Sequence, residues 1–314
     1  MWMTCPREAH LQPSFEDSPS WTSSWVVINI SFTHSMNSNV SRGTIRKMAS
    51  CRVATCKFLA ICLVGGVVLL GCSSENRSKA LVVGMDLSYP PFETIDEKGK
   101  PSGISVRIAE ALADFLGRPL RIENIPFVGL IPSLQSRRID CIISSMTDTA
   151  ERRQSIAFSD AYLSIGLALL AGARSDLSNA ADVDRAERTL VVRQGTTGEL
   201  WAKSNLKKAK VLSVEKENSA VLEVIQGKAD AFIYDQISIW QNWKKHPEST
   251  RALLAPLQKE GWAIGIRRDD EELRLKINAF LKEYREKGGF EKLGDEFLSE
   301  QKKAFERENI PFYF

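Results

Sequence analysis

A short run of hydroxyl and basic residues, Ser144 to Arg152, has the residue types and spacing to bind a small carboxylate. The apolar run before it ends in Ser144 and Ser145, and Thr149 is a candidate N-cap for a helix with Arg152 in its first turn. Free N–H groups at a helix N-terminus and a guanidinium both favour an anion, and hydroxyls can donate or accept. Taken alone, the pattern also fits an ordinary capped junction between a strand and a helix.

Two further segments strengthen the interpretation as a binding site. The turn 194–198, Gln-Gly-Thr-Thr-Gly, separates a predicted strand from a predicted helix, so its N–H groups and hydroxyls could face a ligand. It lacks the lysine of a phosphate-binding loop, which argues against a nucleotide, and a plain helix entry is its alternative. Asp235 follows the predicted strand 229–234 and could bind an ammonium group, cap the helix beginning at Gln236, or do both.

Composition excludes several other classes of protein. With 314 residues, 43% hydrophobic and 26% charged, the chain is long enough for two lobes with separate cores. The net charge of +3 comes without a basic run interleaved with aromatics, so we expect no nucleic-acid partner. His10, His34 and His246 lie far apart, and we expect neither a metal nor another cofactor. Cys141 is the one cysteine of the expected globular part and should be a buried, inert thiol.

The N-terminal region resembles a bacterial lipoprotein signal. Basic residues precede the apolar stretch Phe58 to Leu70, which ends in Leu-Leu-Gly before Cys72. We expect a signal peptide over 48–71, acyl chains such as palmitate on Cys72, and a tether over 72–78. Residues 1–47 are expected to be a non-native upstream extension, with translation beginning at Met48. An uncleaved anchor or a chance cysteine is the alternative.

From residue 79 onward, the hydrophobic pattern predicts alternating strands and helices. This alternation favours an α/β fold with a mostly parallel sheet covered by helices. The expected strands are 80–85, 120–125, 140–144, 189–192, 210–214, 229–234 and 261–266, with an apolar run at 163–171 that ends the first unit. The expected helices include 108–116, 130–135, 199–205, 219–226, a stretch from residue 270 and a final amphipathic segment at 290–305.

Several motifs, taken in chain order, resemble the extracytoplasmic solute-binding proteins, of the family 3 type, that serve ABC transporters for polar amino acids. The resemblance covers residues 79 to 298. The motifs are Tyr89-Pro90-Pro91-Phe92-Glu93, Gly103-Ile104, Gly129-Leu130-Ile131-Pro132-Ser133-Leu134-Gln135, Ile139-Asp140 with Met146-Thr147 and Glu151-Arg152, Phe158-Ser159-Asp160, Gln194-Gly195-Thr196-Thr197 and Ala229-Asp230-Ala231 with Asp235.

The resemblance implies a two-lobed periplasmic binding protein fold, with two doubly wound sheets joined by two crossing strands. Lobe 1 would comprise 79–170 and 263–314, and lobe 2 would comprise 171–262. The implied function is to bind a free amino acid, without catalysis, and to deliver it to an inner-membrane ABC permease with its ATPase. The protein would be a monomer in the periplasm or cell envelope, anchored to the lipid bilayer through Cys72.

The resemblance also assigns roles in the site. Arg152 would bind the α-carboxylate, aided by Thr147 and the turn at Thr197, and Asp235 would bind the α-ammonium. Aromatic side chains would line the side-chain pocket. The complete set of expected ligand-binding residues is Asp86, Tyr89, Phe92, Phe127, Ser144, Ser145, Thr147, Arg152, Arg193, Thr196, Thr197 and Asp235.

The chain departs from the family pattern at a few positions. Ser105 and Arg107 stand where acidic residues are usual, which should affect local pairing more than binding. Asp148 stands where an apolar residue is common. If Arg193 faces the cleft, it would favour an acidic ligand and disfavour arginine or lysine; if it faces solvent, it carries no such information.

Two alternative functions share the same residues. One is a cyclohexadienyl dehydratase-like enzyme, in which an acid in the cleft would do the chemistry. The other is a ligand-sensing surface receptor that works without a transporter. Neither a Ser-His-Asp arrangement nor a redox pair is visible in the sequence, which favours binding without catalysis.

Overall fold

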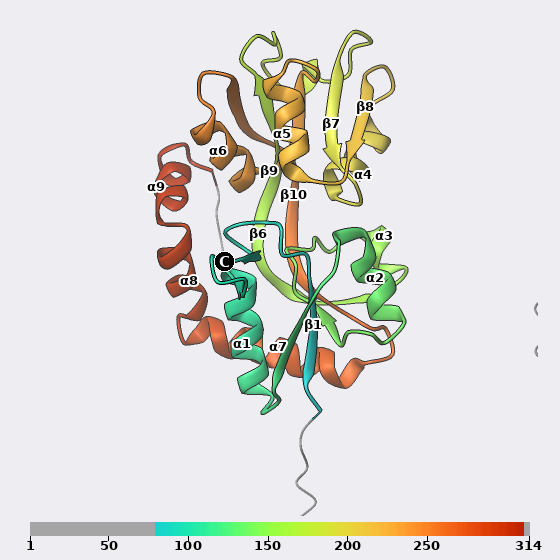
Figure 1. The fold of residues 1–314 in the computed structure, drawn as a ribbon, viewed down its shortest axis with the longest axis vertical. Helices are drawn as coiled ribbons and strands as arrows, with labels where there is room; N and C mark the ends of the chain where they lie inside the picture. The colour runs from blue at the N-terminus through green and yellow to red at the C-terminus, as the bar shows by residue number, and fades with distance from the viewer. Residues whose placement is uncertain (1–78, 311–314) are drawn as a thin grey trace, which may run out of the picture. The chain divides into compact units, whose positions relative to one another are not determined.

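The computed structural model describes residues 79–310, so the expected signal peptide, Cys72 and the upstream extension lie outside the described residues. This part is an α/β structure (Figure 1). Its mixed sheet has eight strands in the order β4-β1-β5-β10-β6-β9-β7-β8. The strands of this sheet are β1 (Leu81–Met85), β4 (Leu120–Asn124), β5 (Cys141–Ile142), β6 (Ala157–Gly172), β7 (Thr189–Arg193), β8 (Lys210–Val214), β9 (Ala231–Asp235) and β10 (Thr250–Ile266). Two short strands, β2 (Thr94–Ile95) and β3 (Pro101–Ser102), form a separate two-stranded sheet.

Helices cover the faces of this sheet. They are α1 (Ile104–Phe115), α2 (Phe127–Gln135), α3 (Ala150–Arg153), α4 (Thr197–Asn205), α5 (Glu217–Ile225), α6 (Gln236–Lys245), α7 (Glu271–Glu286), α8 (Gly289–Phe297) and α9 (Ser299–Arg307), with a short 3-10 helix at Ala180–Asp182. The expected final amphipathic segment is divided into α8 and α9, which meet at Leu298. No helix among residues 79–310 is long and apolar enough to span a bilayer.

We call β1, β4 and β5 with their covering helices lobe 1. β1 pairs in parallel with both β4 and β5, and all five of its residues are buried. Successive residues of a strand point to opposite faces, so Leu81, Val83 and Met85 pack with α1 and α7. Val82 points the other way and packs with Leu130 of α2. A strand covered on both faces is apolar throughout, and this explains the continuous apolar run in the sequence.

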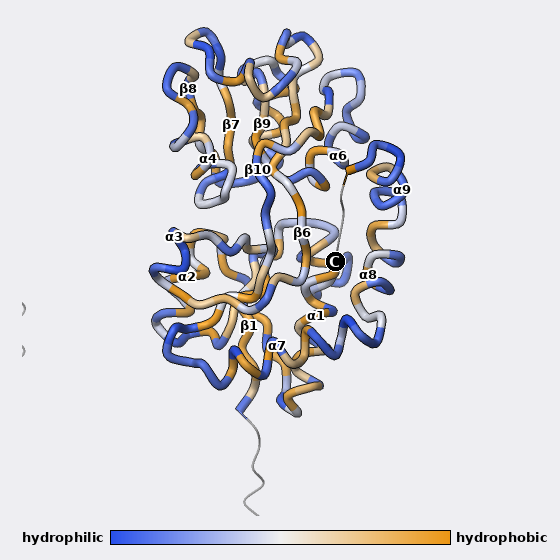
Figure 2. Tube along the Cα trace, turned by 180° about the vertical axis from the view of Figure 1, so that it is seen from behind, coloured by the Kyte–Doolittle hydropathy of each residue, from blue (hydrophilic) through white to orange (hydrophobic). Residues whose placement is uncertain are grey.

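We call β7, β8 and β9 with their covering helices lobe 2. β7 pairs in parallel with β8 and β9. Leu190 and Val192 pack toward Ala202 of α4, while Val191 packs toward Val221 of α5. The hydropathy colouring in Figure 2 shows apolar strands inside this lobe and polar loops at its far end. The sheet of lobe 2 is therefore covered on both faces, like that of lobe 1.

Two long antiparallel strands, β6 and β10, run through both lobes. β10 pairs with β5 in lobe 1, and β6 pairs with β9 in lobe 2, which joins the two parallel sheets into one hydrogen-bonded sheet. The fold is therefore the expected two-lobed one, with the crossing strands continuous with both sheets. The sequence pattern predicted only 261–266 of β10, because the polar stretch around Gln258 to Glu260 conceals the first part of the strand.

Close packing of α4 on lobe 2 generates a prediction. A Cβ atom added at Gly198 would lie 2.5 Å from the carbonyl oxygen of Ile233, a backbone atom of β9 that cannot move freely. We expect Gly198→Ala to lower the free energy of unfolding by about 1–3 kcal/mol, measured by urea denaturation. Gly172→Ala is the matched control, because its nearest neighbour would lie 3.6 Å away. A Gly198→Ala variant as stable as the parent would contradict this packing.

Candidate functional site

A cavity lies between the lobes, where the loops that follow β1, β5, β7 and β9 meet the crossing strands. Ligand sites of open α/β sheets form at such carboxyl ends of strands. All the predicted site residues except Phe92 line this cavity, and five lining residues were not predicted. The full lining is Asp86, Tyr89, Glu93, Phe127, Ser144, Ser145, Thr147, Arg152, Leu167, Arg193, Thr196, Thr197, Tyr234, Asp235, Glu260 and Trp262.

Arg152 reaches the cavity from α3 of lobe 1. Thr149 caps this helix as predicted, its hydroxyl accepting a hydrogen bond from the Arg152 N–H at 3.1 Å. The helix has only four residues, so the guanidinium, rather than a helix N-terminus, is the group that attracts an anion here. The guanidinium donates to the carbonyl of Thr147 at 2.7 Å and to the carbonyl of Gly195, in lobe 2, at 3.0 Å. Burial lowers the pKa of Arg152 to about 10, which leaves it charged at neutral pH.

The turn at Gly195 places the start of α4 against the cavity. Gly195 has φ +75°, which favours glycine, and its N–H donates to Glu199 at 2.8 Å. The Thr196 hydroxyl donates to the carbonyl of Arg193 at 2.7 Å, so this hydroxyl stabilises the turn. Thr197 is the first residue of α4 and its hydroxyl lies within hydrogen-bond reach of Glu260.

Asp235 ends β9 and is both a helix cap and a cavity carboxyl. Its Oδ1 accepts from the N–H of Ser238 at 2.9 Å, and its Oδ2 accepts from the Tyr89 hydroxyl of lobe 1 at 2.6 Å. Burial raises the pKa of Asp235 to about 7, although both hydrogen bonds lower it. A cation placed beside this carboxyl would favour its charged form.

Glu93 is a buried acid that the sequence analysis did not place in the site. It accepts hydrogen bonds from Ser105 at 2.6 Å, from Ser145 at 3.0 Å and from Ser144 at 3.2 Å. Burial raises its pKa to about 8, and the serine hydrogen bonds lower it. Ser105, noted as a departure from the family, thus supports this carboxyl. Glu93 follows an aromatic turn, and only the fold brings the serines to it.

Glu260 is a second acid that the sequence pattern did not reveal. It lies on the crossing strand β10 and accepts from the Thr147 hydroxyl at 3.0 Å. Burial raises its pKa, while the Thr197 and Thr147 hydroxyls and the charge of Arg152 oppose that rise. The groups expected to bind a ligand carboxylate therefore already interact with a protein carboxyl in this conformation.

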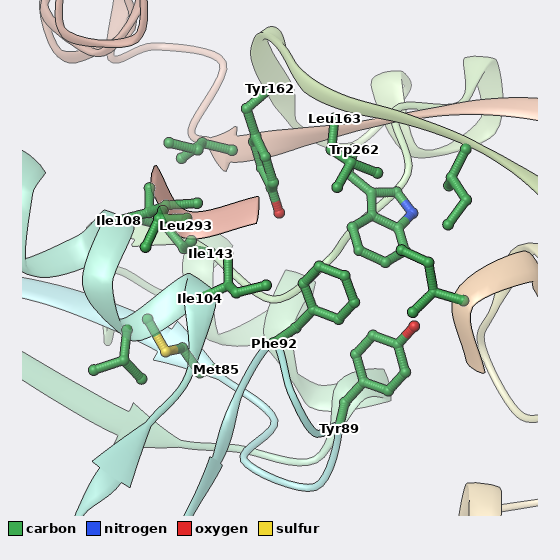
Figure 3. Close-up of a cluster of buried hydrophobic side chains, with 14 of the residues drawn as sticks. Met85, Tyr89, Phe92, Ile104, Ile108, Ile143, Tyr162, Leu163, Trp262 and Leu293 are labelled. Carbon is green, nitrogen blue, oxygen red and sulfur yellow. The ribbon is translucent and has the colours of Figure 1, made fainter. Parts of the chain in front are cut away.

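Aromatic side chains form one wall, and here Phe92 is a correction to the sequence analysis. Phe92 is fully buried behind the wall, its ring stacked on Tyr89 at 5.3 Å and edge-on to Trp262 at 4.8 Å between ring centroids. Figure 3 shows Phe92 between these two rings and the aliphatic core. A ring without a polar atom is best placed in the interior, whereas Tyr89 has a hydroxyl that reaches Asp235. Tyr234, which was not predicted, also lines the cavity.

The structure also places the residues that depart from the family pattern. Arg193 faces the cavity and forms an ion pair with Asp86. Asp148 instead forms an ion pair with Arg153 at the surface. Cys141 is buried in β5, and burial raises the pKa of its thiol to about 12. Among residues 79–310, no three His, Cys, Asp or Glu side chains are grouped so as to hold a metal ion.

Comparisons with known proteins agree with this fold. The family model of bacterial extracellular solute-binding proteins, family 3, matches residues 81–300. The histidine-binding periplasmic protein of Escherichia coli K12 is 28% identical over 69% of this chain and 86% of its own. The L-arginine-binding protein of Pseudomonas aeruginosa is 27% identical over 76% of this chain and 96% of its own.

Solved structures are also similar. A putative binding component of an ABC transporter from Wolinella succinogenes, complexed with lysine, is 31% identical with a TM-score of 0.66, over 70% of this chain and 95% of that one. An ancestral amino acid-binding protein described as a precursor of cyclohexadienyl dehydratase is 30% identical with a TM-score of 0.64, over the same shares of the two chains, 70% and 95%.

The buried carboxyls generate a prediction for the ligand-free protein. The folded pKa values of about 8 for Glu93 and about 7 for Asp235 exceed the ordinary values of 4.5 and 3.8, so the folded state holds protons that the unfolded state has released. This contribution to stability is complete below about pH 4 and is lost as pH rises to about 8. We expect Glu93→Gln to make the free energy of unfolding fall less steeply between about pH 5 and about pH 8, measured by denaturant titrations.

Glu97→Gln, at an exposed turn position, is the control for this experiment and should leave the decline unchanged. A Glu93→Gln variant with the same pH dependence as the parent would show that Glu93 does not carry a raised pKa.

Proposed function

We propose that this chain, which belongs to the family 3 bacterial extracellular solute-binding proteins, captures a polar amino acid between its lobes and delivers it to the permease of an ABC transporter. One observation carries the proposal: the buried cation Arg152 of lobe 1 and the buried carboxyl Asp235 of lobe 2 line the same cavity. A zwitterion presents one carboxylate and one ammonium, so it can complete the interactions of both groups at once.

The contacts follow from the chemistry of the lining. The ligand carboxylate would accept hydrogen bonds from Arg152 and from the hydroxyls of Thr147 and Thr197, and it would replace Glu260 as the acceptor of the two hydroxyls. The ligand ammonium would donate to Asp235, with Ser144 and Ser145 beside it. The remaining predicted residues would form the walls and the side-chain end of the pocket: Asp86, Tyr89, Phe127, Arg193 and Thr196.

Closure of the lobes accompanies binding in this proposal. Contacts between the lobes already include the Tyr89 hydroxyl on Asp235 and the Arg152 guanidinium on the carbonyl of Gly195. A ligand that touches both lobes would add to these contacts and so favour the closed state over an open one. A permease could then distinguish loaded from empty protein by shape.

The cell-envelope setting is also part of the proposal. The relatives named above include periplasmic binding proteins, and the sequence around Cys72 resembles a lipoprotein signal. We infer a signal peptide over 48–71, a lipid anchor on Cys72 and a tether over 72–78, with the binding protein acting as a monomer at the membrane surface. The limits of lobe 1 (79–170 and 263–314) and lobe 2 (171–262) belong to the same proposal.

Arg152 provides the direct test. We expect Arg152→Ala to weaken the binding of the preferred amino acid by at least about 30-fold in isothermal titration calorimetry, because it removes the buried partner of the ligand carboxylate. Arg153→Ala is the matched control: it is the adjacent residue, but its side chain is 57% exposed and pairs with Asp148. Equal affinities for the parent and Arg152→Ala would exclude the assigned role.

The pKa of Asp235 predicts how the affinity for the ligand depends on pH. Its pKa of about 7 means that the charged form, which binds an ammonium, is lost as pH falls below 7. We expect the affinity for a zwitterion to rise between about pH 5 and pH 8, by up to tenfold per unit at the acid end. Asp235→Asn should reduce this rise, leaving only the part that comes from Glu93, and should weaken binding at pH 8. An affinity that does not change with pH would contradict an ammonium at Asp235.

A dehydratase activity is the second candidate. The buried acids Glu93 and Asp235, with pKa values of about 8 and 7, have the range of a general acid, and one similar structure is a dehydratase precursor. Turnover of prephenate or arogenate by the purified protein would establish that function instead. Amino acid binding without stimulation of a reconstituted permease would favour a sensing receptor.

A further inference from the structure

The inference concerns the charge at one end of the cavity and rests on the proposed amino acid-binding function. Arg193 of lobe 2 forms an ion pair with Asp86 of lobe 1, and their side chains are only 5% and 12% exposed. Phe127 lies beside the pair, with its ring centroid 5.8 Å from the Arg193 guanidinium. Asp86, Phe127 and Arg193 also line a neighbouring groove that extends to Glu215 and Lys216. The Asp86–Arg193 pair therefore lies between the cavity and that groove and separates them.

Asp86 has little capacity left for a ligand cation. Its Oδ1 accepts from the Ser88 hydroxyl at 2.6 Å. Its Oδ2 accepts from the N–H of Phe127 at 3.0 Å and from Arg193. A carboxylate has about four acceptor positions, so one is left, on Oδ1. The guanidinium of Arg193 already compensates the charge of Asp86.

Most of the N–H donors of the Arg193 guanidinium are also engaged in hydrogen bonds. Its Nε donates to the carbonyl of Glu215 at 3.2 Å, and its Nη1 donates to the Tyr234 hydroxyl at 3.1 Å. Its Nη2 donates to Asp86 and, at 3.4 Å, to the Ser88 hydroxyl. A guanidinium has about five N–H donors, so one is left, on Nη1. The pair as a whole is neutral and still offers one acceptor and one donor.

A charged ligand side chain would interact unfavourably with the Asp86–Arg193 pair. An ammonium or guanidinium would meet the Asp86 carboxylate only where Arg193 already compensates its charge, so it would gain no unpaired partner there. A second carboxylate would meet a cation already neutralised by Asp86, with the carboxyls of Glu93, Asp235 and Glu260 on the same cavity. Both charges would lose hydration without gaining an unpaired partner.

We propose that the Asp86–Arg193 pair selects an amino acid with an uncharged side chain that both donates and accepts hydrogen bonds, and that a carboxamide is the best match. A carboxamide carries an NH2 donor and an oxygen acceptor, which complement the remaining acceptor of Asp86 and the remaining donor of Arg193. The site would thus differ from those of the histidine-binding and arginine-binding relatives.

The first experiment compares ligands on the unmodified protein. Isothermal titration calorimetry of the purified, ligand-free chain with glutamine, asparagine, glutamate, arginine and lysine should show a carboxamide ligand bound at least about tenfold more tightly than the charged ones. Arginine, lysine or glutamate bound as tightly as the better carboxamide would overturn the inference and leave the proposed function intact. No binding of any of these five, nor of histidine or cystine, which relatives of this chain bind, would instead overturn the proposed function.

The second experiment removes the charge of one member of the Asp86–Arg193 pair at a time. Arg193→Leu leaves the Asp86 carboxylate without its partner, so affinity for arginine or lysine should increase by about 10- to 100-fold. Asp86→Asn should shift preference toward glutamate by the same logic. Arg274→Leu, on the surface of α7 and paired with Glu271, is the control and should not change preference.

Gains of affinity cannot arise from loss of folding, so these variants remain informative. If both variants fold, shown by circular dichroism, and keep the ligand order of the parent, the pair does not select the ligand.

Discussion

The burial of charge between two lobes is the constraint on which the cleft depends. A charged group removed from water is tolerated when it is paired or hydrogen-bonded. Here Arg152, Arg193 and Asp235 each have a partner from the opposite lobe: the carbonyl of Gly195, the carboxylate of Asp86 and the hydroxyl of Tyr89. The crossing strands β6 and β10 hold the lobes at the distance at which these pairs form. The closed arrangement is therefore stabilised by contacts that would be lost if the lobes separated.

A ligand would have to replace hydrogen bonds that already exist in the cavity. Glu260 already accepts from Thr147 and Thr197, so a ligand carboxylate at the proposed position would gain affinity only by the difference between its own interactions and those it replaces. The same holds for Asp235, whose carboxyl is held by Tyr89 and Ser238. Such preorganisation reduces the cost of ordering side chains when the ligand binds.

The buried acids connect binding with protonation. Glu93 is surrounded by three serine hydroxyls and the aromatic wall, and burial makes its neutral form dominant near neutral pH. Asp235 lies closer to balance between its two forms. A ligand cation would shift both groups toward the charged form, so proton release would accompany capture. Serine hydroxyls suit this role, since they can donate to a carboxylate and accept from a carboxylic acid.

The sequence by itself determined the local features of the site and, through the order of its motifs, the family. The cap at Thr149, the glycine turn at Gly195 and the carboxyl at the end of β9 are each fixed by neighbouring residues, so the predictions for them needed no tertiary information. The tertiary structure decided which residues from distant parts of the chain lie next to these local features. Glu93 and Glu260 join the site because turns and a crossing strand bring them to residues far away in the chain, and a polar stretch in a strand gives no periodic signal. Phe92 and Tyr89 look equivalent in the sequence, but the fold places the Phe92 ring behind the cavity wall and brings the Tyr89 hydroxyl to Asp235. It also turns Arg193 toward Asp86, so that this guanidinium is paired with a carboxylate inside the cleft.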